Sequence, residues 1–314
     1  MLSYYKNQDY DLEKIDEPVA NCWINAVAPT PDEKKLLVSL GIPLDYITYA
    51  LDADERSRVE EEDDGTILIV IRVPHYVGSD ESVPYITIPL GIIIVDKYIV
   101  TISATESEII SIFELGQAAK ISTTKRNRFA LRILMRATVS FLDDVREMSK
   151  VLDDLEGKLY ASMRNTELLA LLQYQKCYVY FAQALKQNEL ALYRLSKYEK
   201  IRRFDEDVEL LEDILVENTQ AIDMTNITSS ILANLMDAYA SVISNNLNVV
   251  MKLLASVTII LSIPNIISGF FGMNVNFAPI IQHNPNMPTI LAVVTLAVTL
   301  AGRQIGRASC RERV

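Results

Sequence analysis

The sequence predicts an α+β domain, then a long helical stalk, then a membrane-spanning segment. Three observations predict this order. Short β-branched runs alternate with loops over residues 1–120, glycine and proline are absent between Gly157 and Pro264, and charge is absent from Leu253 to Phe271. These patterns are typical of strands, of long helices and of a bilayer span, respectively.

The N-terminal region 1–120 has the pattern of a small domain of mixed strands and helices. Four runs of six to twelve residues are rich in valine, isoleucine and threonine, which predicts strands. They are residues 23–28, 66–74, 85–96 and 98–103. Thr30-Pro31 before an amphipathic run predicts the start of a helix. We therefore expect an α+β domain here.

The stalk region, residues 121–247, has the pattern of long helices, and the last of them extends beyond it. Breaks in the pattern predict helices over about 125–164, 166–200 and 206–270. The last would be about 97 Å long at 1.5 Å per residue. This length exceeds the core of a single domain, so we expect oligomer packing or a stalk.

The stalk helix leads into a first predicted transmembrane helix at 248–273, followed by a loop at 274–288. A second predicted span at 289–303 contains an uncharged run, Thr289–Gly302, of 14 residues, which is about 21 Å of helix and too short to cross a bilayer. We interpret it as a truncated second transmembrane helix. Ile305–Val314 matches one reading frame of a common sequencing adapter, so residues 304–314 are treated as a non-native tail.

Composition excludes several classes of protein. The 314 residues carry a formal charge of −11, and half of them are apolar. This balance argues against disorder and against nucleic-acid binding. Three cysteines without a Cys-x-x-Cys pair, and two histidines, argue against a disulfide scaffold or a zinc ribbon. The usual nucleotide-binding and hydrolase motifs are absent, so we expect neither an enzyme nor ATP-driven transport.

We interpret the Asp143-Asp144 and Asp153-Asp154 pairs as solvated or inter-helix acidic surface.

A polar stripe runs along the last long helix at steps of three and four residues. Its members up to the span are Asp213, Val216, Gln220, Asp223, Ile227, Ser230, Asn234, Asp237, Ser241, Ser244 and Asn248. It continues through Met251, Ala255, Thr258, Ser262, Asn265, Gly269 and Gly272. A coiled coil would place leucine or isoleucine at such a seam. Small and polar residues also serve as contacts between membrane helices. The stripe as a whole favours a water-filled pore, because Asn265 beside Pro264 at mid-membrane is costly unless it faces water or a partner. Its lack of charge within the span suits a hydrated cation, which must bind weakly enough to leave.

The first span closes on Gly272-Met273-Asn274. With this tripeptide at the end of a long helix, before a short loop and a second apolar run, the chain resembles the CorA family of magnesium transporters. The resemblance covers the native chain from end to end. It implies a multi-pass protein of the cell membrane with a cytoplasmic N-terminal domain. It also implies a funnel-shaped homopentamer, with the first spans around a central pore and uptake of Mg²⁺, with Co²⁺ or Ni²⁺ as further ions.

The resemblance also implies roles for particular residues. Asn274, Gly272 and Met273 would form the outer pore mouth. The lining would include Asn265, Ser262, Thr258, Ala255, Met251 and Asn248. Regulatory intracellular Mg²⁺ would bind between subunits at Asp213, with Asp80 or Glu81 as the partner. Relatives often carry carboxylates in the loop between the spans, whereas Val275–Pro288 has none.

Two other functions stay open from the sequence. A transporter of Zn²⁺ or another transition metal could share this fold, although few histidines and cysteines lie near the pore, and softer metals prefer those ligands. A membrane-anchored interaction protein is the third interpretation. An apolar seam on the long helix would have favoured it, and the observed seam is polar.

Overall fold

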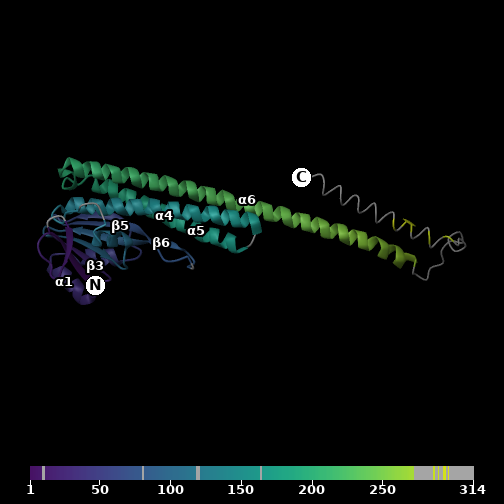
Figure 1. The fold of residues 1–314 in the computed structure, drawn as a ribbon, viewed down its shortest axis with the longest axis horizontal. Helices are drawn as coiled ribbons and strands as arrows, with labels where there is room; N and C mark the ends of the chain where they lie inside the picture. The colour runs from purple at the N-terminus through teal and green to yellow at the C-terminus, as the bar shows by residue number, and fades with distance from the viewer. Residues whose placement is uncertain are drawn as a thin grey trace. The chain divides into compact units, whose positions relative to one another are not determined.

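The computed structural model describes residues 1–8, 11–79, 81–117, 121–162 and 165–271, together with residues 286, 289, 293, 294 and 296. It divides into two units, residues 1–236 and 237–314. The last long helix contributes to both units (Figure 1).

A seven-stranded sheet forms the centre of the first unit, with strand order β2-β1-β3-β7-β6-β5-β4. The strands are β1 Leu2–Gln8, β2 Asp11–Ile15, β3 Cys22–Val27, β4 Arg58–Glu61, β5 Ile67–Tyr76, β6 Tyr85–Ile94 and β7 Tyr98–Ser103. The β3–β7 pair is parallel, and every other pair is antiparallel. Successive side chains of β5 point to opposite faces of the sheet, and because both sets are apolar, both faces are covered. Ile67, Ile69 and Ile71 enter one core and Leu68 and Val70 the other.

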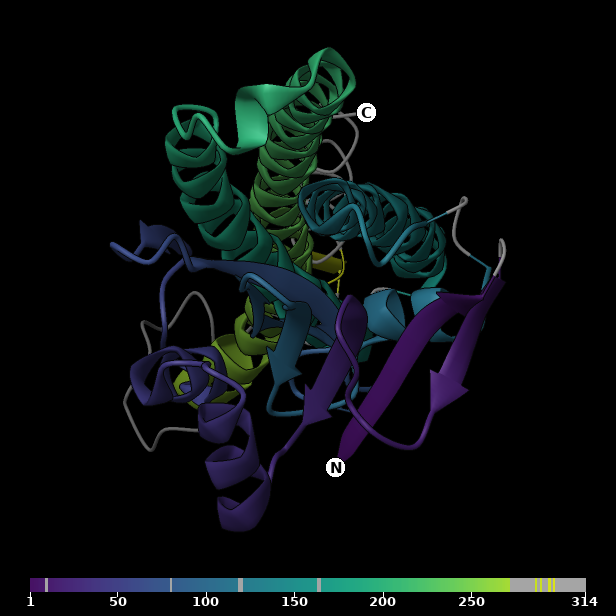
Figure 2. The same ribbon diagram turned by 90° about the vertical axis from the view of Figure 1, so that its left-hand side faces the viewer.

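Two short helices cover one face of the sheet, α1 Pro31–Ser39 and α2 Leu44–Leu51 (Figure 2). Helix α1 begins as the Thr30-Pro31 pattern predicts. The Thr30 hydroxyl accepts from the Glu33 N–H, and the Glu33 carboxylate accepts from the Thr30 N–H, which makes a capping box. Helix α2 approaches β6 so closely that a Cβ at Gly91 would collide with the Cβ of Ala50. Only glycine fits at that crossing.

The opposite face of the sheet carries the long helices (Figure 2). The long helices are α4 Arg126–Ser162, α5 Asn165–Leu195 and α6 Asp205–Phe271, and the short helix α3 Glu108–Glu114 and a 3-10 turn at Ile201–Arg203 lie on the same side. Their apolar sides meet the sheet in a core that includes Phe113, Phe129, Leu192 and Leu211. Asn188 of α5 fixes the helix to the sheet, since its side-chain oxygen accepts from the Arg72 N–H at 2.9 Å and its amide donates to the Arg72 carbonyl at 2.8 Å.

The predicted architecture of an α/β soluble part and a long helix with one apolar span is confirmed. The four expected strands and the three long helices are present, with ends that differ by a few residues. The sequence patterns did not single out β1, β2 and β4, which lie at or next to the sheet edges and carry many polar residues. The predicted loop and the truncated second span lie outside the described residues, except for residues 286, 289, 293, 294 and 296.

Candidate ion pathway on the long helix

Helix α6 is one continuous helix of 67 residues, from Asp205 to Phe271. It begins where the Phe204 carbonyl accepts from the N–H groups of Asp207 and Val208, at 3.0 and 3.2 Å. Three acidic residues, 205–207, fill its first turn and complement the positive end of the helix dipole. The helix therefore starts at a defined point and carries the predicted stripe without a break as far as Gly269.

Within residues 205–236, α6 has one buried face and one exposed face. The buried positions follow a spacing of three, four and seven residues: Leu211, Ile214, Asn218, Ala221, Thr225 and Leu232. The stripe lies on the other side and is exposed at Asp213, Gln220, Asp223, Ile227, Ser230 and Asn234. The buried face of α6 therefore packs into the core of its own chain, and the polar stripe stays uncovered by that core.

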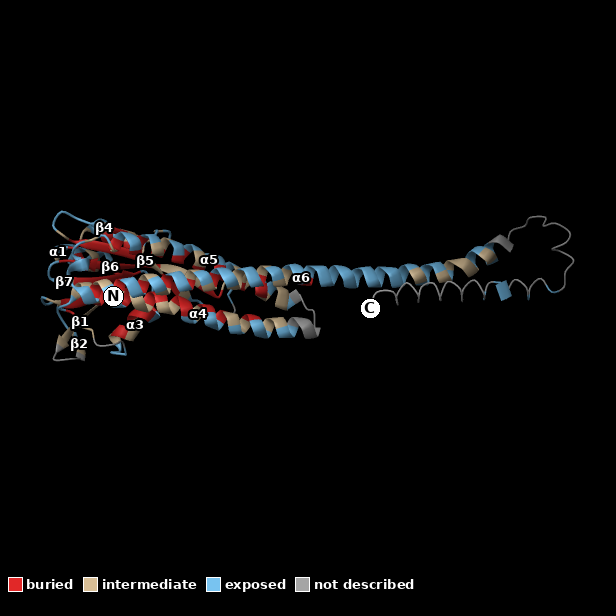
Figure 3. Ribbon diagram, turned by 90° about the horizontal axis from the view of Figure 1, so that it is seen from above, coloured by how far each residue is buried: buried red, intermediate tan, exposed pale blue. Residues whose placement is uncertain are grey.

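Along residues 237–269 the whole circumference of α6 is largely open (Figure 3). Its most apolar 18-residue window has a mean hydropathy of 1.9, and none of that window is buried. Among the described residues this is the one helix long and apolar enough to cross a membrane. Large apolar side chains such as Leu253, Leu261 and Ile266 are about 60% exposed or more. Lipid or other protein must cover such a surface.

The hydroxyl groups of the span have a defined orientation. Thr258 donates to the Leu254 carbonyl at 2.8 Å, and Ser262 donates to the Thr258 carbonyl at 2.7 Å. Ser256 bonds to the Lys252 carbonyl in the same way, at 2.8 Å. Because each hydroxyl hydrogen is directed back along the helix, the oxygen presents its remaining lone pairs outward. Thr258 and Ser262 thus offer acceptors on the stripe.

Pro264 adds a further acceptor in the span. It lies inside the helix and has no N–H. The Ile260 carbonyl, four residues earlier, therefore lacks the donor that the helix would otherwise supply. The exposed Asn265 side chain comes directly after the proline. Backbone and side-chain oxygens are thus concentrated at mid-span, where bare hydrocarbon could not satisfy them.

The described part of the chain contains some of the predicted site residues and lacks others. Asn248, Met251, Ala255, Thr258 and Asn265 are exposed on α6, and Ser262 is half-buried. Gly272, Met273, Asn274 and Asp80 lie outside the described residues. Asp213 and Glu81 are exposed, and no ion pair or hydrogen bond joins them within one chain. In the described ranges, three or more His, Cys, Asp or Glu side chains are nowhere grouped for a metal ion.

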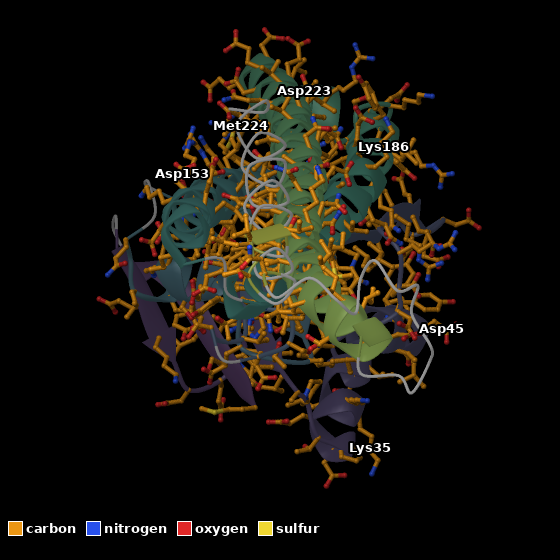
Figure 4. All side chains as sticks on the ribbon, turned by 90° about the vertical axis from the view of Figure 1, so that its right-hand side faces the viewer. Lys35, Asp45, Asp153, Lys186, Asp223 and Met224 are labelled. Atoms are coloured by element: carbon orange, nitrogen blue, oxygen red, sulfur yellow. The ribbon has the colours of Figure 1, made fainter. Side chains whose placement is uncertain are left out.

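Two features of this chain were not predicted from its sequence. Lys252 is the one charged residue in the sequence between Asp237 and Phe271. A lone lysine where a span begins is a usual mark of the cytoplasmic side and could have been found. The second feature is Asp144, for which the sequence predicts a solvated or inter-helix surface. Burial, then the nearby Glu108 and Asp143, raise its pKa to about 7. Asp153, by contrast, is exposed and points outward (Figure 4).

A soluble α/β unit, followed by one long helix with an apolar span, is the architecture of a membrane protein. The chain belongs to the CorA-like Mg²⁺ transporter protein family, whose model matches residues 20–303. Members of this family are ion transporters.

Individual relatives agree with this family. The cobalt/magnesium transport protein CorA of Methanocaldococcus jannaschii is 28% identical over 288 residues, which cover 88% of this chain and 87% of that protein. The complete structure of the CorA magnesium transporter from the same organism matches with a TM-score of 0.82 at 26% identity, covering 97% of this chain and 96% of that one. The ZntB cytoplasmic domain from Vibrio parahaemolyticus matches with a TM-score of 0.60 at 11% identity over 77% of this chain and 98% of that one, which shows the fold alone.

Proposed function

We propose that the chain is the protomer of a Mg²⁺ channel of the cell membrane that also admits Co²⁺ or Ni²⁺. Five copies would assemble with the first spans around a central pore and the second spans outside them. The soluble unit would be cytoplasmic. The observation that carries the proposal is the α6 stripe, which is mostly polar or small, continuous, and left free by the fold of its own chain.

The chemistry of the stripe supports a hydrated ion. Mg²⁺ gives up its water reluctantly, and a hydrated cation presents the hydrogens of its waters outward. Thr258 and Ser262 present lone pairs because their own hydrogens bond inward. Asn248 and Asn265 add amide oxygens. Such a lining accepts hydrogen bonds from the water shell without displacing it.

The absence of carboxylates in the span supports passage rather than capture. No carboxylate occurs between Asp237 and Phe271 in the sequence. Ions are therefore not trapped by a strong site, which conduction requires. A divalent ion gains about 4.6 kcal/mol per 100 mV of membrane potential. This gradient is enough to drive uptake, with Asn274, Gly272 and Met273 proposed as the outer mouth.

Regulation by intracellular Mg²⁺ belongs to the same proposal. Asp213 is exposed on the stripe side of α6, and Glu81 is exposed in the loop between β5 and β6. Within one chain no ion pair or hydrogen bond joins the two carboxylates, and we propose that a shared ion lies between neighbouring subunits. Asp80 is the alternative partner of Asp213.

The deciding experiment is uptake into liposomes. The second span would be completed to about 20 apolar residues with a basic tail. We expect Mg²⁺ influx into vesicles loaded with a Mg²⁺-sensitive dye, and its loss in Asn274→Ala. Gln282→Ala, in the same loop, should retain influx.

Other outcomes separate the remaining functions. Influx of Zn²⁺ without Mg²⁺ would replace the Mg²⁺ channel with a transition-metal transporter. An absence of influx for every cation from a folded assembly would favour a membrane anchor.

A further inference from the structure

A cavity of about 530 Å³ lies within the first unit, at the end of the sheet where α4 and α6 begin. It is lined by the Asp64–Gly65 turn, the end of β6, the first turn of α4 and the junction that leads into α6. Its volume is in the range of small-molecule sites. The cavity is separate from the α6 stripe, and neither transport nor the proposed Mg²⁺ regulation makes use of it.

Cationic side chains outnumber carboxylates in this cavity, although the chain as a whole is strongly acidic. The cations are Lys125, Arg126, Arg128, Lys200 and Arg203. The carboxylates are Asp64, Asp96 and Asp207. An excess of positive charge in a concave site favours an anionic ligand.

Two of the five cations are already neutralised by the fold. Arg128 Nε lies 2.6 Å from the buried Asp207 carboxylate, and its guanidinium also pairs with Glu206. Lys200 Nζ lies 3.0 Å from both the Glu61 carboxylate and the Gly65 carbonyl. These bonds build the walls of the cavity.

Three cations remain without a carboxylate partner in the described part of the chain. Arg126 donates to the neutral side chain of Asn21 at 2.7 Å. The exposed Lys125 makes no ion pair, and the Arg203 guanidinium lies 5.7 Å from the centre of the Phe204 ring. These groups are available to a ligand.

The backbone N–H groups at the start of α4 add further hydrogen-bond donors for an anion. The first intrahelical bond runs from the Phe129 N–H to the Lys125 carbonyl at 2.9 Å. Among the described residues, the N–H groups of residues 126–128 have no acceptor. Free N–H groups at a helix start, beside unpaired cations, bind phosphate oxygens well.

The rest of the lining favours a nucleotide over a bare phosphate. Asp64 and Asp96 form no ion pairs in the described ranges. One oxygen of the Asp64 carboxylate accepts from the Thr66 N–H at 2.8 Å, which leaves its other oxygen and the Asp96 carboxylate to accept from ribose hydroxyls. Phe204 is 55% exposed and offers an aromatic face to a flat base. A molecule with an anionic end, hydroxyl groups and a ring matches these three kinds of group.

We propose that this cavity binds a nucleoside di- or triphosphate. Its phosphates would contact Lys125, Arg126, Arg203 and the start of α4, with the base against Phe204. No local sequence pattern indicates this site, because its residues come from four separate segments. The site has no Walker-type loop, so it would bind its ligand without hydrolysing it. Binding would then make the state of the soluble unit depend on the nucleotide concentration.

The test is a binding measurement on the full chain in detergent, in Mg²⁺-free buffer so that chelation has no effect. Titration calorimetry would compare ADP, pyrophosphate and adenosine. We expect ADP to bind more tightly than pyrophosphate, and adenosine not to bind. The double variant Lys125→Glu/Arg203→Glu should weaken ADP at least about tenfold, since two charge-assisted contacts are reversed.

The controls distinguish the effect of reversing a charge in this cavity from the effect of reversing a charge elsewhere on the chain. Lys176→Glu changes an exposed lysine of α5 outside the cavity and should leave ADP binding unchanged. Phe204→Ala should weaken ADP but not pyrophosphate, and it gives an independent measurement if the double variant fails to fold. Absence of ADP binding at about 1 mM, or equal binding by the double variant and the parent, would overturn the proposal. Neither result depends on Mg²⁺ uptake.

Discussion

Two polar side chains of the long helices, Asn188 on α5 and Asp144 on α4, show how neighbouring groups decide what burial costs. Asn188 is buried, but its amide group bonds to the backbone of Arg72 and to Ser57, so its polar atoms keep partners. Asp144 lies near Glu108 and Asp143, and the opposing effect of Arg136 on its pKa is smaller. A buried polar group is tolerated when it is paired and is costly when it faces like charge.

Asp144 makes the stability of the protein depend on pH. Its folded-state pKa of about 7 exceeds the ordinary value of 3.8, so the folded protein binds this proton more tightly. The contribution of this bound proton to the stability of the folded state is fully present below about pH 4, and it is lost as the pH rises through 7. We expect Asp144→Asn to be more stable than the parent at pH 8, by on the order of 1–2 kcal/mol, with little difference near pH 4. Thermal unfolding in detergent at both values would measure this. A variant that is less stable at pH 8 would contradict it.

At the scale of the element, α6 shows one helix serving two environments. Its first half buries Leu211, Ile214 and Leu232 against its own chain, as an amphipathic helix does. Its second half leaves apolar residues exposed on every side. The stripe is the feature that both halves share, since it stays free from Asp213 to Asn265.

The proposed pore face of α6 can be tested by cysteine accessibility. Ser262 lies on the stripe, whereas the neighbouring Leu261 is 62% exposed on another face. With Cys310→Ser as background, Cys22 and Cys177 are buried and should stay unreactive. We expect a charged thiol reagent to block uptake by Ser262→Cys at least about tenfold faster than by Leu261→Cys, because only a wet face admits the reagent. Equal rates would show that the stripe is not the pore face.

At the scale of the molecule, the exposed surface of the span requires partners. Lipid suits Leu253 and Ile266, but it cannot satisfy the amide of Asn265 or the free carbonyl created by Pro264. A ring of copies would resolve this conflict, because the stripe would face water while the apolar sides face lipid and neighbouring helices. This supports the proposed homopentamer.

The proposed regulation predicts an effect of Asp213→Asn. If Asp213 holds Mg²⁺ between subunits, removing its charge should weaken inhibition by intracellular Mg²⁺ several-fold, since a carboxylate is a preferred ligand of this ion. Initial influx at graded internal Mg²⁺ would measure it. Glu212→Gln removes an equally exposed charge one residue away and should leave inhibition unchanged. If both variants respond alike, general surface charge is responsible and the assigned site is wrong.

Local pattern was sufficient for much of the fold. The strand at Tyr98–Ser103, the start of α1 at Thr30 and the extent of α6 are explained by β-branched runs, a capping sequence and the absence of glycine and proline. The strand Arg58–Glu61 could not be predicted, because its polar residues pair with β5 only once the sheet has formed. The position of the stripe could be predicted because helical periodicity is a property of one segment.

The order of elements, the membrane span and the polar stripe were therefore predictable from sequence alone, since each depends on neighbouring residues along the chain. Three other features required the folded chain: which face of α6 is buried, why Asp144 holds its proton, and that Lys125, Arg203 and Phe204 share a cavity. These depend on segments that are distant in sequence. Burial and charge act through space, so their effects appear only when the chain is folded.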